Sequence, residues 1–146
     1  MHFELREEQQ QFQDTVLRFA RDELAAGALE RAHDPNYPWD VSRKIADMGL
    51  MGLCLPESDG GQGGSLMDAV IAIQAVASAC PRSADVIQAG NFGPVRVFAA
   101  YGSPWQKERY LKPILAGEAL ISVGMSEPEA GSAVTELRTS ATPDGD

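Results

Sequence analysis

The residues best suited to chemistry lie near the end of the sequence, in segment 123–132. A predicted strand ends there at Pro128, because proline has no N–H to donate to a continuing ladder. The small residues Ala130, Gly131 and Ser132 then form a turn whose backbone N–H groups can approach a ligand closely. Such N–H groups can hold a pyrophosphate by their dipoles alone. Taken by residue type only, the segment is interpreted as an ordinary strand and turn, with a ligand site as the alternative.

Other reactive side chains match no specific catalytic or metal-binding pattern. The glycine run 60–64 lacks both the GxGxxG register and a Gly-Lys-Ser/Thr ending, so we interpret it as flexible backbone before a helix, with ligand contact as the alternative. Cys54 and Cys80 form no CxxC pair and are predicted to be small, buried, reduced side chains. His2 and His33 stand alone and are predicted to be solvated. No metal site is predicted.

The composition is that of a folded, acidic chain. Its 146 residues carry a formal net charge of −9, with 44% hydrophobic and 23% charged residues. A chain of this length can build a core without disulfides or metal. Its scattered basic residues argue against nucleic acid as a partner. No run approaches the ~20 apolar residues that cross a bilayer, and the first residues resemble neither a signal nor a transit peptide. We therefore expect a cytoplasmic protein that binds no membrane.

The elements that must position segment 123–132 are mostly helical. Apolar residues recur with helical spacing between Leu5 and Leu24, which predicts a long amphipathic helix over 5–26. Ser65 and Ser103 are predicted to cap the starts of later helices, and Gly49 is predicted to cap the end of one. Helices are predicted over 38–48, 65–79, 84–101 (distorted by Gly90, Gly93 and Pro94) and 103–112; strands over 119–125 and 135–142; and a turn over 143–145.

Three short motifs follow one another along the chain and together cover most of it. They are GLMGL (49–53) with LPE (55–57) and GG (60–61), QKERYL (106–111) with LAGE (115–118), and MSEPEAGS (125–132). In this order they resemble the G-x-x-G…P-E…G-G, Q-K-x-x-Y-L…L-x-x-G-E and (L/M)-(T/S)-E-P-x-x-G-S motifs of the acyl-CoA dehydrogenase family. The sequence departs from the family at Ala133, where Asp is usual.

The resemblance implies a mainly α fold. An N-terminal helical-bundle domain would occupy residues 1–118, and the first strands of a β-barrel or sandwich domain, incomplete in this chain, would occupy 119–146. The cofactor of the family is FAD, bound between these domains.

The same resemblance implies which residues meet the flavin and the substrate. Val123 and Met125 would pack near the isoalloxazine ring, and Ser126 would hydrogen-bond its polar edge. Gly131 and Ser132 would lie at the pyrophosphate. An acyl-CoA substrate would meet Ser132 and a pocket lined by Val86, Gly90 and Gly93.

The family reaction is α,β-dehydrogenation of an acyl-CoA thioester. A carboxylate removes the α-proton while the β-hydrogen passes as hydride to the flavin. The family's base is a Glu that follows the β domain, and no residue of 1–146 corresponds to it. We therefore predict no catalytic residue in this chain and no activity of the chain alone.

The implied partners are an electron-transfer flavoprotein or similar acceptor, and further copies of the chain in a dimer or tetramer. Two alternatives stay open. One is a non-catalytic helical interaction module or subunit of the same fold, and the other is a relative of the acyl-CoA oxidase type.

Overall fold

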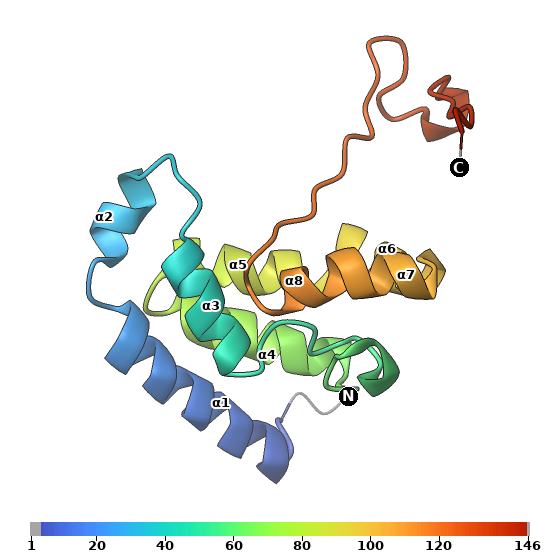
Figure 1. Cartoon of the computed structure of the whole chain (residues 1–146). Coiled ribbons are helices and arrows are strands. Elements are labelled where there is room, and N and C mark those ends of the chain that lie inside the picture. The colour runs from blue at the N-terminus through green and yellow to red at the C-terminus, as the bar shows by residue number, and fades with distance from the viewer. Residues whose placement is uncertain (1–3, 146) are drawn as a thin grey trace.

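Helices follow one another as far as residue 115 in the computed structural model, which describes residues 4–145 (Figure 1). The α-helices are α1 (Glu7–Phe19), α2 (Ala28–His33), α3 (Trp39–Asp47), α4 (Leu66–Ala77), α5 (Pro81–Asn91), α6 (Pro94–Tyr101), α7 (Pro104–Gln106) and α8 (Lys112–Leu115). Two π-helical segments, η1 (Ala20–Leu24) and η3 (Lys107–Leu111), continue α1 and α7; η2 (Glu57–Asp59) and η4 (Val134–Glu136) are 3₁₀ turns.

The predicted helix over 5–26 is confirmed as α1 together with η1. Val16, Ala20 and Leu24 are completely buried, and their spacing of four residues places them on one side of the helix. The acidic residues Glu7 and Glu8 occupy the first turn, where the helix dipole favours negative charge. Helix formation here follows from local periodicity, so the sequence was sufficient to predict it.

Helix α4 lies in the middle of the core, where it packs against α1 and α5. Its N-terminus is capped as predicted, because Ser65 Oγ accepts a hydrogen bond from Asp68 N at 3.3 Å while the Asp68 carboxylate accepts one from Ser65 N at 2.8 Å. A smaller apolar cluster joins the chain after α3 to α6 and η3–α8. Its buried members are Leu55, Val95, Ala99, Leu111 and Ile114.

Asn91, at the end of α5, is a buried polar residue whose amide is fully used. Its Nδ2 donates to the carbonyl oxygens of Leu50 at 2.8 Å and Ile87 at 2.9 Å, and its Oδ1 accepts from Cys54 N at 3.2 Å. These bonds fasten α5 to the irregular segment 50–54. A buried amide is tolerated there because each of these groups has a partner.

The segment 84–101 is mostly helical, as predicted, and it divides into α5 and α6 at Phe92 and Gly93, where Gly93 adopts a φ of +60°. Helix α2 was not predicted, since its six residues bury no side chain completely and therefore carry no clear apolar periodicity. Pro81 begins α5 at its first position, as proline can.

The strands predicted over 119–125 and 135–142 are not formed among the described residues. Residues 119–126 belong to no helix or strand, and the second region includes the 3₁₀ turn η4. The only bridge in this part of the described chain joins Glu127 and Ala130. A strand requires a neighbouring backbone, and alternation in a sequence cannot report whether one is present. The mainly helical fold class is nevertheless confirmed.

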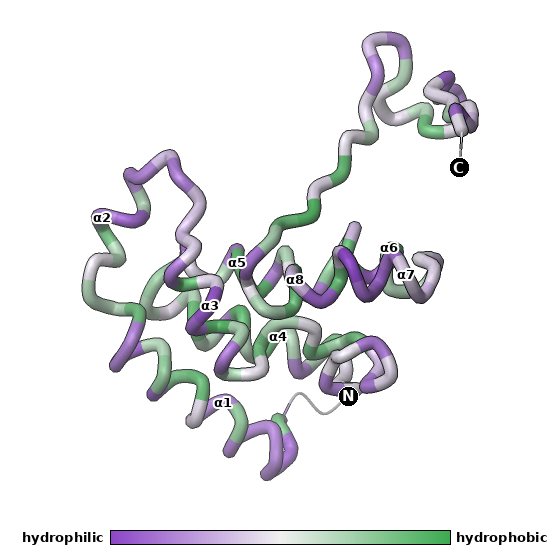
Figure 2. Tube along the Cα trace, viewed as in Figure 1, coloured by the Kyte–Doolittle hydropathy of each residue, from purple (hydrophilic) through white to green (hydrophobic). Residues whose placement is uncertain are grey.

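The segment after α8 leaves the helices and runs away from them (Figure 1). Figure 2 shows that its first part is largely hydrophobic. The cysteines are both free, with Cys80 buried and Cys54 partly so. His33 is exposed, and His2 lies outside the described residues.

Candidate functional site

A groove of about 590 Å³ lies between α6 and the segment that follows α8. We call it the α6 groove. Residues 121, 123 and 125 are every second residue of the extended chain. Their side chains therefore share one face. The apolar side chains that line the groove are Val97, Phe98 and Tyr101 from α6, and Ile121, Val123 and Met125 from the extended segment.

The walls of the α6 groove expose large apolar side chains. The exposed fractions are 60% for Val97, 86% for Tyr101, 65% for Val123 and 55% for Met125. Contiguous apolar exposure on this scale marks a surface that another group covers. The extended segment also has free backbone: within residues 4–145, no N–H of residues 120–126 donates a hydrogen bond to the protein. The groove therefore combines an apolar surface with a row of available donors.

The turn after the groove is closed by Glu127. Its N–H donates to Ala130 O at 3.0 Å, and Ala130 N donates back to Glu127 O at 3.1 Å. The carboxylate accepts from Arg138 N at 2.9 Å, from Thr139 N at 2.8 Å and from the Thr139 hydroxyl. The hydroxyl of Thr139, followed by the two backbone N–H groups, lowers the pKa of the Glu127 carboxyl. Hydrogen bonds between Glu127 and residues 138–139 thus join the two ends of a loop formed by residues 127–139.

The sequence-predicted site residues fall into three places. Gly93, Val123 and Met125 meet in the α6 groove. Ser126, Gly131 and Ser132 are exposed just beyond it, and an added Cβ at Gly131 would meet no atom within 4 Å, so the turn is open.

The other two predicted site residues, Val86 and Gly90, lie inside the helical core. Val86 is 1% exposed, and a Cβ on Gly90 would lie 2.5 Å from Met51 Sδ. The structure does not bring these two residues to the groove.

The groove residues of α6 were missed in the sequence. Val97 and Tyr101 are four residues apart and exposed, while Val95 and Ala99 are buried. On a helix this spacing gives two apolar faces rather than one. That second apolar face was the available signal.

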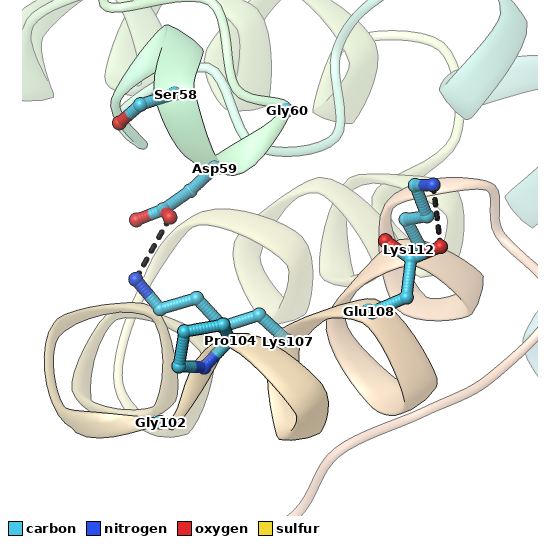
Figure 3. A pocket seen from close by; sticks show the side chains of 8 residues that line it. All are labelled: Ser58, Asp59, Gly60, Gly102, Pro104, Lys107, Glu108 and Lys112. Atoms are coloured by element: carbon cyan, nitrogen blue, oxygen red, sulfur yellow. Dashed lines mark hydrogen bonds and ion pairs between the residues drawn. The ribbon is translucent and has the colours of Figure 1, made fainter.

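A second cavity, of about 400 Å³, is lined by charged side chains (Figure 3). Lys107 Nζ lies 2.8 Å from Asp59 Oδ1, and these side chains are 26% and 14% exposed. Lys112 Nζ lies 2.7 Å from Glu108 Oε1 on the surface. The cations drawn in Figure 3 therefore already have carboxylate partners. The inner pair joins the glycine loop after α3 to η3, which links two of the three sequence motifs.

The two cysteines differ in their surroundings. Burial would raise the pKa of the Cys80 thiol, but hydrogen bonds from Ser83 and Arg31 outweigh it and the net shift is downward. Ser83 Oγ donates to Cys80 Sγ at 3.0 Å. For Cys54, burial is the main cause of a raised thiol pKa. Within residues 4–145 no group of acidic, histidine and cysteine side chains could hold a metal ion, and no described helix is long and apolar enough to cross a membrane.

A family model described as the N-terminal domain of acyl-CoA dehydrogenases matches residues 6–118. The chain belongs to the acyl-CoA dehydrogenase family. The resemblance drawn from the three motifs is thereby confirmed.

Named relatives match nearly the whole chain. It is 33% identical to 3-sulfinopropanoyl-CoA desulfinase of Paraburkholderia xenovorans over 99% of its length, and 34% identical to a probable acyl-CoA dehydrogenase of Bacillus subtilis over all of it. A solved structure of a probable acyl-CoA dehydrogenase from Mycobacterium abscessus superposes with a TM-score of 0.77 at 32% identity, over 97% of this chain. The chain spans 37%, 38% and 38% of these three proteins.

Proposed function

We propose that the protein is an FAD-dependent enzyme that dehydrogenates an acyl-CoA thioester between its α- and β-carbons. In this proposal residues 1–118 form the helical domain, and residues 119–146 begin a second domain that carries part of the flavin site. The observation that carries the proposal is the α6 groove, whose exposed apolar wall runs directly into the MSEPEAGS motif. The match of the family model to residues 6–118 supports the same division.

The residues present fit a flavin. The exposed side chains of Val123 and Met125 offer an apolar surface for the isoalloxazine ring, and the Ser126 hydroxyl follows them as a donor for its polar edge. Gly131 and Ser132 lie in the open turn, where small residues admit a pyrophosphate to backbone N–H groups. When bound, FAD supplies the hydride acceptor for the reaction. The role of the chain's own residues is to bind the ring, orient it and exclude water from the α6 groove.

An acyl-CoA thioester is the proposed substrate. Gly93 lines the α6 groove and leaves room for an acyl chain, while Ser132 lies where the CoA part would approach. Val86 and Gly90 would contribute only through packing, by holding α5 against Met51. Both relatives described above have a CoA thioester in their names, which supports this substrate class.

The catalytic base would come from outside residues 1–146. None of the side chains that line the α6 groove is a carboxylate, and the carboxylate of Glu127, which follows the groove in the chain, already accepts hydrogen bonds from three donors. Without a positioned base the α-proton stays on the substrate. The chain of 146 residues would therefore bind but not react.

A flavin titration tests the cofactor assignment. FAD added to the purified protein should lose fluorescence as it binds, and Val123→Asp should weaken binding by about tenfold or more, because the flavin ring would then bury an unpaired charge. Val70→Asp is the matched control, since Val70, in α4, is also exposed but does not line the groove. Equal FAD affinity in both variants, or no binding by the unaltered protein, would contradict the assignment and favour the non-catalytic module.

Addition of an acyl-CoA tests the location of the base. The visible absorbance of bound flavin should persist when an acyl-CoA is mixed anaerobically with the 146-residue chain. Bleaching of the flavin in that mixture would place the base inside residues 1–146 and overturn this part of the proposal.

A second candidate reaction is removal of a sulfinate group from a CoA thioester. It is favoured by a specific observation: three relatives that are 33–35% identical to the chain are named 3-sulfinopropanoyl-CoA desulfinase. Release of sulfite from that thioester, without net reduction of an electron acceptor, would favour this reaction over dehydrogenation.

The proposed partners are an electron-transfer flavoprotein or similar acceptor, and further copies of the chain in a dimer or tetramer, in the cytoplasm. Oxygen consumption during turnover would indicate an oxidase, whereas reduction of the acceptor protein would indicate a dehydrogenase. Sedimentation of the protein would report its oligomeric state.

A further inference from the structure

The Glu127 carboxylate closes a loop across eleven and twelve residues of chain. Its Oε2 accepts from Arg138 N at 2.9 Å, and its Oε1 accepts from Thr139 N at 2.8 Å and from the Thr139 hydroxyl. Between these ends lie Gly131 and Ser132. Each of the two N–H groups donates to a different oxygen of the same carboxylate. One ionised carboxylate therefore provides acceptors for both N–H groups.

We propose that Glu127 is a positioning residue for the flavin site, because its carboxylate holds residues 127–139 in the closed loop that presents Gly131 and Ser132. The inference rests on the proposed function. It adds a role for Glu127, the acidic residue of the motif whose carboxylate bonds to the other end of its own loop. Glu127 touches neither cofactor nor substrate in this role. It acts through the backbone of Arg138 and Thr139.

Little else holds the loop in shape. Within residues 127–139, Ala130 is the one buried residue. The remaining backbone bonds are the Glu127–Ala130 pair and a turn from Glu136 N to Ala133 O at 2.9 Å. A segment with so few buried contacts opens easily unless specific bonds close it. The carboxylate bonds span the whole loop, whereas the other bonds span three residues each.

The chemistry requires a carboxylate at this position. A carboxylate accepts hydrogen bonds at both oxygens, whereas the amide of glutamine has one oxygen and one NH₂ group. Glu127→Gln would therefore set a donor against the N–H of Arg138 or Thr139. Glu129, in the same loop, is exposed and makes no hydrogen bond to another described residue, so Glu129→Gln removes the same charge without breaking a hydrogen bond of the loop.

The test measures loop closure and flavin affinity separately in the 146-residue chain. Loop closure is followed by NMR as the chemical shifts of the Arg138 and Thr139 amide protons during an acid titration. In the unaltered chain both signals should shift together as Glu127 gains a proton, at a pH below the ordinary range for Glu because the pKa of this carboxyl is lowered. The coupled shift should vanish in Glu127→Gln and persist in Glu129→Gln.

Flavin affinity is measured by fluorescence titration with FAD. Glu127→Gln should weaken FAD binding roughly tenfold, Thr139→Val roughly threefold, because two of three bonds remain, and Glu129→Gln less than about twofold. A merely structural role would alter the amide shifts without this graded loss of affinity.

The outcomes are distinguishable. If Glu127→Gln abolishes the coupled amide shift but binds FAD as the unaltered chain does, the positioning role is wrong while the proposed function stands. If the coupled shift is absent from the unaltered chain, the closed loop itself is wrong. If the unaltered chain binds no FAD, the proposed function fails, and the positioning role fails with it even where the amide titration shows a closed loop.

Discussion

The helical body (residues 7–117) and the C-terminal segment (residues 119–145) differ in what holds them. The helical body buries apolar side chains from α1, α3, α4 and α5 in one cluster and from α6 and α8 in another. In the C-terminal segment, Ala130 is the one buried residue. The loop of this segment is closed by hydrogen bonds to the Glu127 carboxylate instead. The stability of the chain thus resides in one region and its most chemically suggestive motif in the other.

The contrast has a physical cause. Helices satisfy their backbone groups internally, so a helix needs only an apolar face to pack. An extended segment leaves its N–H and C=O groups unpaired until another backbone or a ligand supplies partners. The α6 groove lies where the two regions meet, and its exposed side chains come from both.

The largest expected effect is in the core of the helical body. Ile87, in α5, is completely buried, so Ile87→Ala should lower the free energy of unfolding by about 2–5 kcal/mol. Val123→Ala, in the C-terminal segment, should change it by less than about 0.5 kcal/mol because Val123 is exposed. Urea unfolding of both variants measures the difference, and equal losses would break the comparison.

The next largest loss of stability is expected for a polar side chain in the same helix. Asn91→Ala leaves the Cys54 N–H and the Leu50 carbonyl without partners in a buried site and should cost about 2–3 kcal/mol. Gln88→Ala, an exposed change on the same helix, should stay within about 0.5 kcal/mol. A loss for Asn91→Ala as small as the control's would mean that water satisfies these groups.

Two glycines provide a matched pair across the regions. Gly117 has a φ of +70°, and a Cβ there would lie 2.5 Å from Ser42 O, so Gly117→Ala should cost about 1–3 kcal/mol. An added Cβ at Gly124 would meet no atom within 4 Å, so Gly124→Ala should be near neutral. Thermal unfolding compares the two variants. If Gly124→Ala proved destabilising, Gly124 would have to be packed against other atoms, in contradiction to its open surroundings.

The smallest expected effect concerns the ion pairs of Figure 3. A double-mutant cycle on Asp59 and Lys107 should give a coupling of about 0.5–1 kcal/mol, because both side chains are mostly shielded from water. The Glu108–Lys112 pair is 69% and 70% exposed and should give about 0.2–0.5 kcal/mol. The first coupling should survive added salt better than the second, and the reverse order would contradict this interpretation.

Several elements could be predicted because their causes are local. Ser103 caps α7 by accepting from Gln106 N at 3.2 Å, and Gly49 adopts a φ of +73° just after α3, both as predicted. Pairings between distant residues could not be predicted in the same way. The Asp59–Lys107 ion pair joins residues 48 positions apart, and nothing in either local sequence selects the other.

The candidate site divides along the same line. Its motif was recognised from residue types in order, and the family match confirms the family that this order indicated. The lining by Val97 and Tyr101, and the burial of Val86 and Gly90 away from the groove, could not be predicted. They depend on how α6 packs after the break at Phe92 and Gly93, which involves contacts between separated parts of the chain.

By itself, the sequence determined the helices other than α2, the caps named above and the family, because each depends on periodicity or on residues close together in the chain. The tertiary structure alone decided that Gly93, Val123 and Met125 line one groove, and that Glu127 closes its loop on Arg138 and Thr139. Both depend on contacts between separated parts of the chain. The free energy of such contacts cannot be inferred from a local sequence pattern.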